Sequence, residues 1–241
     1  MKDRDVIKSF VAYLKENGHP SLEVERWPED KNRGSKEIDA IAGDFAIEHT
    51  SIDTLPHQRR NSDWFMKAVG GLERELSNSL PYRLSIRLQY QAVRKGQNWS
   101  AISSALRNWI ITGASLLEDR DHVLDRIPGV PFLLYVEKDS SRRPGVIFAR
   151  SDPGDHTLSD RIREQLLGKA NKLLKYQMTG KTMLLLVESE DIALMNELKM
   201  LAAIWKAFSG GLPPGVDQVW YADTSIPREI CFKDFTLALK R

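Results

Sequence analysis

The chain has 241 residues, of which 41% are hydrophobic and 28% are charged, a composition typical of a globular protein that buries a core. Lys and Arg total 35 against 33 Asp and Glu, so the net charge of +2 is too small to indicate nucleic-acid binding by itself. The single cysteine, Cys231, excludes an intramolecular disulfide and a cysteine-rich zinc site, and it favours a reducing, cytoplasmic location.

Neither a secretory signal nor a membrane span is expected. The first five residues are mostly charged, and no apolar segment follows them. The longest apolar runs, such as residues 183–187, are far shorter than the roughly 18 residues that a membrane helix needs. We therefore expect no membrane partner.

The first fifty residues predict a helix followed by three short strands. The helix covers residues 4–17, the strands cover 22–27, 38–42 and 45–50, and a polar loop lies at 28–35. Gly43 and Asp44 separate the last two strands, and this dipeptide suits a tight hairpin turn because glycine tolerates positive φ.

From residue 58 onwards, helices and strands alternate. The predicted helices are 58–80, 99–117, 159–176 and 192–208, and the predicted strands are 82–90, 132–137, 146–149, 182–188, 216–221 and 230–232. This alternation predicts an α/β fold with a mixed central sheet flanked by helices. No segment resembles a flexible linker, so we expect one integrated domain over residues 1–241, with Pro153-Gly154 as the weaker candidate boundary.

The predicted hairpin opposes two carboxylates. With a two-residue turn, the numbers of paired residues sum to 87, which places Asp39 opposite Glu48 and Glu37 opposite Thr50 on one face of the hairpin. Ile38 and His49 then lie on the other, more apolar face, with Ala40, Ala42, Phe45 and Ile47. Like charges so close destabilise a ladder, and a hard divalent cation such as Mg²⁺ or Mn²⁺ would offset the repulsion. An exposed hairpin whose polar face meets water is the alternative.

With these residues, the sequence resembles the PD-(D/E)XK nuclease superfamily, which has the restriction-endonuclease-like fold. The core of that fold is a helix, a three-stranded meander, a second helix and a further strand, with Asp on one hairpin strand and Glu-x-Lys on the next. The resemblance covers about residues 1–95, leaving about 96–241 as an α/β extension. Asp39 and Glu48 would be the catalytic metal ligands.

The motif departs from the family at one position. Thr50 stands where the family has its catalytic lysine, and threonine cannot supply that cation. The candidates to replace it are Lys36, beside the acidic strand, and Gln58, because relatives resembling the RecB-type nucleases place a glutamine on the helix after the Glu-x-Lys strand. Arg59 and Arg60 are further candidate cations, and Glu25 and Glu16 are candidate additional carboxylates of the site.

Two functions remain open from the sequence. The first is a divalent-metal-dependent nuclease that cuts nucleic acid, with DNA favoured over RNA and with the phosphate backbone contacted by Arg59, Arg60, Arg83 and Arg87. Trp64 and Trp99 could stack on bases, although tryptophans at such positions usually anchor a core. The second is an inactive binding module of the same fold, an accessory or regulatory subunit, which Thr50 favours. The long extension could supply a homodimer or partner-binding interface.

Overall fold

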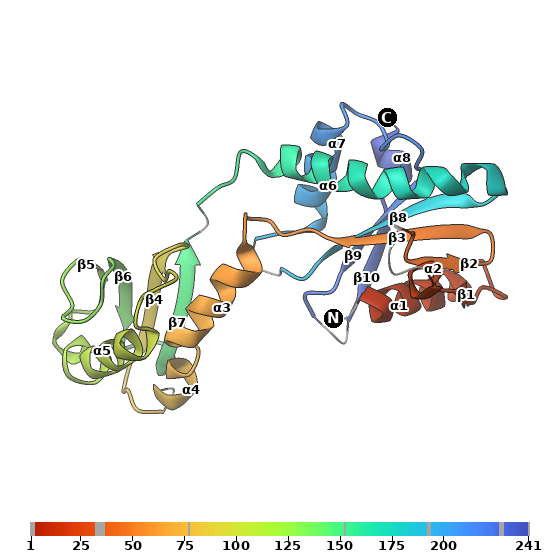
Figure 1. Ribbon diagram of the computed structural model, residues 1–241. Coiled ribbons are helices and arrows are strands. Elements are labelled where there is room, and N and C mark those ends of the chain that lie inside the picture. Colours follow the sequence, from red (N-terminus) through yellow and green to blue (C-terminus); the bar gives the residue numbers. More distant parts are fainter. Residues whose placement is uncertain are drawn as a thin grey trace. The chain divides into compact units, whose positions relative to one another are not determined.

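The computed structural model of the protein describes residues 3–31, 37–76, 78–151, 153–191, 194–226 and 229–240. Its contacts divide the chain into two compact units (Figure 1). Unit 1 comprises Met1–Pro56 and Asp155–Arg241, and unit 2 comprises His57–Gly154. Unit 2 is therefore an insertion between two segments that fold together.

Unit 1 is built on a six-stranded mixed sheet in the order β1-β2-β3-β8-β9-β10. The strands are β1 (Val24–Arg26), β2 (Ala40–Ala42), β3 (Phe45–Ser51), β8 (Thr182–Ser189), β9 (Gln218–Asp223) and β10 (Cys231–Asp234). β3, β8 and β9 are mutually parallel, and the other neighbours are antiparallel. The apolar run of residues 183–187 forms the middle of β8 and is buried on both faces, as a central parallel strand requires.

Helices cover both faces of this sheet. α1 (Asp3–Glu16) packs its apolar stripe on the face that carries Phe45, Ile47 and Leu184. α6 (Leu158–Leu173) and α7 (Glu197–Ala207) pack on the opposite face. The shorter helices of unit 1 are α2 (Pro28–Lys31), η2 (Leu174–Thr179) and α8 (Thr236–Leu239). Figure 1 shows α6 lying along β3 and β8, so side chains on its inner face reach β3.

Unit 2 has its own four-stranded mixed sheet, in the order β5-β6-β4-β7. The strands are β4 (Arg83–Gln89), β5 (Asp121–Leu124), β6 (Leu134–Asp139) and β7 (Gly145–Ser151), and the helices are α3 (Gln58–Val69), α4 (Leu72–Leu76), α5 (Trp99–Thr112) and η1 (Ala114–Leu116). The helices and one face of the sheet enclose a separate hydrophobic core. The other face carries exposed Tyr135 and Ile147.

The α/β class with mixed sheets flanked by helices is confirmed, and most predicted elements occur near their expected positions. The predicted helix 58–80 is two helices, divided at Gly70-Gly71, and β5 was not predicted.

The division of the chain differs from the predicted single domain. The fold has two sheets with two cores, because α3 and β4 pack within unit 2 instead of extending the sheet that contains β3. Residues 57–95, which were predicted to belong to one core with residues 1–56, lie in unit 2, and Gly154 ends unit 2 at the position given as the weaker candidate boundary.

Candidate functional site

The hairpin of β2 and β3 has the register that the sequence predicts. The pairs are Ala42 with Phe45, Ile41 with Ala46 and Ala40 with Ile47. Gly43 takes a φ of +48°, a left-handed conformation that glycine adopts at little cost. Because side chains alternate along a strand, Glu48 and Thr50 lie on the side of the sheet that α6 covers, together with Ala46.

Asp39 lies one residue before β2 and is held against β3 by a hydrogen bond. The backbone N–H of His49 donates to Asp39 Oδ2 at 2.7 Å. The expected ladder pair of Asp39 with Glu48 is not formed, since β2 begins at Ala40. The two carboxylates are nevertheless neighbours, because the same Lys169 Nζ lies within ion-pair distance of both side chains.

The end of the ladder at Ala40 overturns two further details of the predicted hairpin. Ile38 packs in the same hydrophobic cluster as Ile41, on the α6 side, and not on the opposite face. Glu37 is not paired with Thr50 in the β2–β3 ladder; its Oε2 instead accepts a hydrogen bond from the Tyr176 hydroxyl at 2.9 Å.

Two lysines of α6 neutralise Glu48. The Glu48 side chain has 0% exposure, and its Oε1 lies 2.6 Å from Lys169 Nζ and 2.9 Å from Lys172 Nζ. Lys169 Nζ also lies 4.0 Å from Asp39 Oδ2. Lys169 and Lys172 are three residues apart on one helix, so their side chains project to the same face. The site thus combines two carboxylates with two ammonium groups.

The pKa directions reflect this burial. Burial raises the pKa of Glu48 and the charge of Asp39 raises it further, and the two lysines only partly oppose these effects. Burial alone would lower the pKa of Lys172, but its contacts with Glu48, and to a smaller extent the charge of Asp39, outweigh burial and raise it. Lys172 therefore stays protonated and forms a second ion pair with Glu29 at 3.3 Å.

One carboxylate oxygen has no donor. Within the described part of the chain, nothing donates a hydrogen bond to Glu48 Oε2, although this atom is buried. A buried oxygen without a donor is costly and points to a missing ligand or to a functional role. The described residues contain no group of three or more His, Cys, Asp or Glu side chains arranged to hold a metal ion. Among the described residues, the candidate protein ligands for a metal at this site are Asp39 and Glu48.

Asp39 also lines an open cavity. A hollow of about 370 Å³ is lined by Asp3, Arg4, Ile7, Trp27, Glu29 and Asp39. The Asp39 side chain is 15% exposed, whereas the Glu48 side chain is closed to solvent. A ligand in this cavity would contact Asp39 and Glu29, whereas Glu48 does not line it.

Thr50 contacts α6 instead of acting as a cation. Gln165 Nε2 donates to Thr50 Oγ1 at 2.6 Å and to the Ser51 carbonyl at 3.0 Å. Gln165, Lys169 and Lys172 share one face of α6, since they are four and three residues apart. The contact of Gln165 with β3 therefore fixes where the two lysines stand along that strand.

Three of the residues predicted to replace the motif lysine belong to the other unit. Gln58, Arg59 and Arg60 begin α3, which belongs to unit 2, whereas Asp39 and Glu48 belong to unit 1. The helix that packs on β3 within unit 1 is α6, because the whole of unit 2 is inserted before it. Lys36 lies outside the described residues. Glu25 and Glu16 are exposed, and neither forms an ion pair with the lysines of the site within the described residues.

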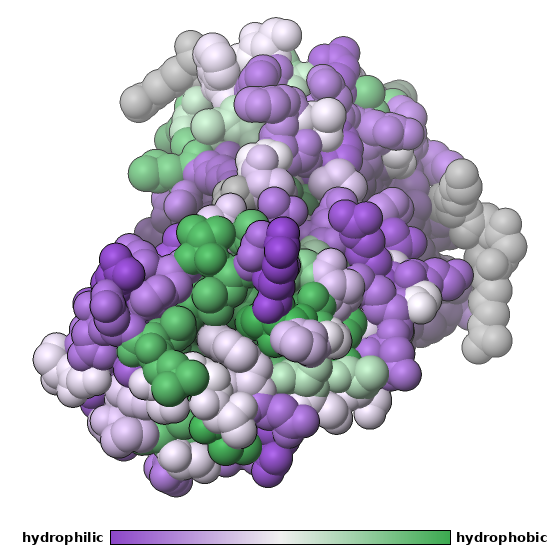
Figure 2. Space-filling view, turned by 90° about the vertical axis from the view of Figure 1, so that its left-hand side faces the viewer, coloured by the Kyte–Doolittle hydropathy of each residue, from purple (hydrophilic) through white to green (hydrophobic). Residues whose placement is uncertain are grey.

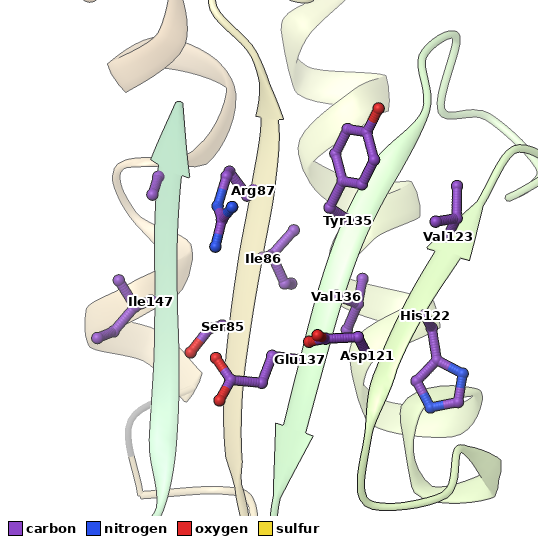
Figure 3. A pocket seen from close by; sticks show the side chains of 11 residues that line it. Ser85, Ile86, Arg87, Asp121, His122, Val123, Tyr135, Val136, Glu137 and Ile147 are labelled. Atoms are coloured by element: carbon purple, nitrogen blue, oxygen red, sulfur yellow. The ribbon is translucent and has the colours of Figure 1, made fainter. Parts of the chain in front are cut away.

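The other predicted phosphate contacts, Arg83 and Arg87, lie on β4 in unit 2. Arg87 lines a hollow of about 380 Å³ on the open face of the sheet, beside Tyr135 of β6 (Figure 3). Asp121 and Glu137 line the same hollow and pair with each other across β5 and β6. Charges of both signs meet there, so this hollow is less suited to a polyanion than a uniformly basic surface.

A second buried polar network lies on the α1 side of the unit 1 sheet. His49 Nε2 lies 3.0 Å from Glu188 Oε2, and the Thr224 hydroxyl donates to Glu188 Oε1 at 2.6 Å. Burial would raise the pKa of Glu188, but its bonds to His49 and Thr224 outweigh burial and lower it. The predicted core-facing side chain of His49 is confirmed, and its position on the far face separates this network from Glu48.

Sequence analysis did not identify four polar residues of these two networks: Lys169, Lys172, Gln165 and Glu188. The spacing of the first three residues within the predicted helix 159–176 was the available signal, because they form one polar stripe.

Comparison of the chain with family models, curated proteins and solved structures yields no match. None of the described helices is long and apolar enough to cross a membrane.

Proposed function

We propose that the protein is a divalent-metal-dependent phosphodiesterase that hydrolyses nucleic acid, with its site at Asp39, Glu48 and Lys169. The observation that carries the proposal is the contact of one ammonium group with both carboxylates. The resemblance to PD-(D/E)XK nucleases lacked a cation at Thr50, and Lys169 supplies one from α6. We infer that Lys169 takes the place of the motif lysine.

The order of elements in unit 1 supports the same proposal. Without unit 2, and apart from the short helices α2 and η2, the chain runs through α1, β1, β2 and β3, and continues through α6 and β8. This is a helix, a three-stranded meander, a second helix and a further strand, which is the succession that the resemblance implies. β8 then pairs with β3 in parallel. Unit 2 occupies the connection between β3 and α6, a position where an insertion leaves the sheet intact.

A hard divalent cation is the cofactor that we infer for this site. Asp39 and Glu48 offer carboxylate oxygens, the ligands that Mg²⁺ and Mn²⁺ prefer, and Glu48 Oε2 lacks a donor among the described residues. A bound divalent cation would polarise the phosphoryl oxygen and lower the pKa of a water for attack. Asp39 and Glu48 would hold that cation, with water and substrate oxygens completing its coordination.

The lysines and the glutamine have separable roles. Lys169 would stabilise the negative charge that develops on the phosphate, since a fixed cation close to the reacting centre is most effective in a buried site. Lys172 is held between Glu48 and Glu29 and would keep the net charge of the site low. Gln165 positions both lysines through Thr50. Thr50 is thereby a positioning residue.

The alternative is a catalytically inactive binding module. It is favoured by the complete burial of Glu48 and by its two ion pairs, which form a neutral network that could serve stability alone. In that case Asp39→Asn and Lys169→Met would change the stability of the fold, and there would be no hydrolysis for them to abolish or slow. A cytoplasmic location and a homodimer or protein partner stay predictions from the sequence.

The test is hydrolysis of plasmid and single-stranded DNA and of RNA, with Mg²⁺ or Mn²⁺ and with EDTA. Asp39→Asn should abolish cleavage and Lys169→Met should slow it by about 10²–10³-fold, while the circular dichroism spectrum of each is unchanged. Glu25→Gln and Lys8→Met remove the same charges at exposed positions of unit 1 and should cleave at the wild-type rate. Wild-type protein that binds nucleic acid but never cuts it would favour the binding module.

A further inference from the structure

The two units carry opposite net charges, although the whole chain is nearly neutral. Residues 57–154 contain fifteen Lys and Arg against ten Asp and Glu, a net charge of +5. Unit 1 contains twenty Lys and Arg against twenty-three Asp and Glu, a net charge of −3. A polyanion is therefore attracted to unit 2 and not to the unit that holds the acidic pair. Figure 2 shows hydrophobic residues exposed among hydrophilic ones on unit 2.

One surface of unit 2 joins cations to tryptophans, and we call it the basic-aromatic surface: Arg60, Trp64, Lys67, Arg94 and Trp99. The Arg60 guanidinium lies 5.0 Å from the Trp64 ring centroid, and the Lys67 ammonium lies 5.5 Å from that of Trp99. The two indoles stack on each other, with centroids 6.5 Å apart and planes inclined by 26°. Trp99 Nε1 donates to the Arg94 carbonyl at 3.1 Å, which attaches the loop before α5 to the stack.

The cations of this surface face solvent with little opposing charge. Arg60, Lys67 and Arg94 are exposed, and so is the adjacent Lys95. Residues 57–71 and 89–100 together hold five Lys or Arg and one carboxylate, Asp63, which pairs with Lys67 at 2.7 Å. Within the described part of the chain, Arg60, Arg94 and Lys95 form no ion pair. These three positive charges are available to phosphate groups.

The cation–π contacts hold two of the long side chains in place before any ligand binds. An exposed cation–π contact is worth only about 0.5–1 kcal/mol, but it reduces the number of conformations that an Arg or Lys side chain samples. Ordering such side chains is a large part of the entropy cost of association. Arg60 and Lys67 are therefore partly preorganised for a phosphate backbone.

We propose that the basic-aromatic surface binds single-stranded nucleic acid. Phosphates would pair with Arg60, Lys67 and Arg94, and unpaired bases would stack on the half-exposed indoles of Trp64 and Trp99. A duplex hides the faces of its bases, so only a single strand can use both parts of the surface. This inference rests on the proposed function and names its substrate class.

The test is fluorescence anisotropy of a labelled oligothymidylate, measured in EDTA so that binding is separated from cleavage. Arg60→Ala with Arg94→Ala should weaken binding about 25-fold at about 0.1 M salt and reduce the slope of log K against log salt by about 1.4, the values for two lost phosphate contacts on a single strand. Arg120→Ala with Arg126→Ala is the matched control, since it removes two exposed arginines from the β5 region of unit 2 and should change neither value.

A second pair of variants tests stacking. Trp99→Leu keeps an apolar side chain against the core but removes the indole, and it should weaken binding about fivefold or more. Trp205→Leu, at a half-exposed position of α7 in unit 1, should bind as the wild type does. Oligouridylate tests RNA in the same assay, and a duplex of the same length should bind at least about tenfold more weakly than the single strand.

The outcomes separate this inference from the proposed function. Absence of binding, equal losses in the two double-arginine variants, or a duplex bound as tightly as the single strand would each overturn the basic-aromatic surface. Binding without cleavage in Mg²⁺ would leave the surface standing and remove the hydrolase. Cleavage by the wild type, together with normal binding by the double variant of Arg60 and Arg94, would support the hydrolase and overturn the role of the basic-aromatic surface.

Discussion

The buried carboxylate of Glu48 gives a prediction whose size follows from its neighbours. Replacing Glu48 by Gln leaves two ammonium groups without their shared counterion, at side chains that are 26% and 15% exposed. Removing one partner of a buried ion pair typically costs about 3–5 kcal/mol. Lys169 keeps a distant contact with Asp39 and Lys172 keeps Glu29, so we expect the lower end, about 3 kcal/mol of unfolding free energy.

Urea unfolding monitored by circular dichroism measures this loss, provided that the transition of unit 1 is fitted separately from that of unit 2. Glu25→Gln, on exposed β1, should stay within about 0.5 kcal/mol of the wild type. Replacing Glu48, Lys169 and Lys172 together by Met should recover most of the loss, because apolar residues of similar size can replace a buried ion network. A Glu48→Gln protein as stable as the wild type would refute the view that this carboxylate holds both lysines.

Three further predictions concern the same unit. The pKa of Glu188 is lowered in the folded state. The stability that this carboxylate contributes is therefore complete above the ordinary carboxyl pKa of 4.5 and is lost as pH falls through the lower folded value. Glu188→Gln should consequently make the urea midpoint fall less steeply in acid than that of the wild type. Gln165→Ala removes two hydrogen bonds to β3 and should lower stability by about 1–2 kcal/mol and the cleavage rate as well, whereas a rate that is unchanged would remove its positioning role. Gly43→Ala forces a left-handed residue and brings a Cβ to 2.9 Å from Leu22 Cδ1, so thermal denaturation should show a loss of at least about 1 kcal/mol, and no loss would contradict the turn geometry.

The hairpin could be predicted from the sequence because its determinants are local. Gly43-Asp44 fixes the turn, and the alternation of apolar and polar residues on both sides fixes the register, which the structure reproduces from Ala40 to Ile47. The predicted pairing failed one residue further out, at Asp39. The end of a ladder depends on tertiary contacts, and the alternation of apolar and polar residues does not determine it. The two carboxylates were found, but their exact placement was not.

The lysines of α6 and the inserted unit could not be found in the same way. Lys169 and Lys172 belong to a helix with many charged residues, and such a stripe usually faces solvent. Only the return of the chain to β3, after residues 57–154, turns this stripe inward. Helices and strands alternate in both units, so the pattern identifies the α/β class but not which strands share a sheet. The resemblance to RecB-type nucleases indicates Gln58 because it lies on the next helix along the chain, whereas the helix that packs on β3 comes later.

The central claim is that an ammonium group from α6 supplies the cation missing from the hairpin motif. The direct measurement is the rate of Mg²⁺-dependent cleavage of single-stranded DNA by the wild type, Lys169→Met and Lys8→Met, each checked for folding by circular dichroism. We predict a fall of about 10²–10³-fold for Lys169→Met, the usual effect of removing one group that stabilises transition-state charge, and no change for Lys8→Met. Cleavage by Lys169→Met at the wild-type rate, or no cleavage by the wild type in either Mg²⁺ or Mn²⁺, would contradict it.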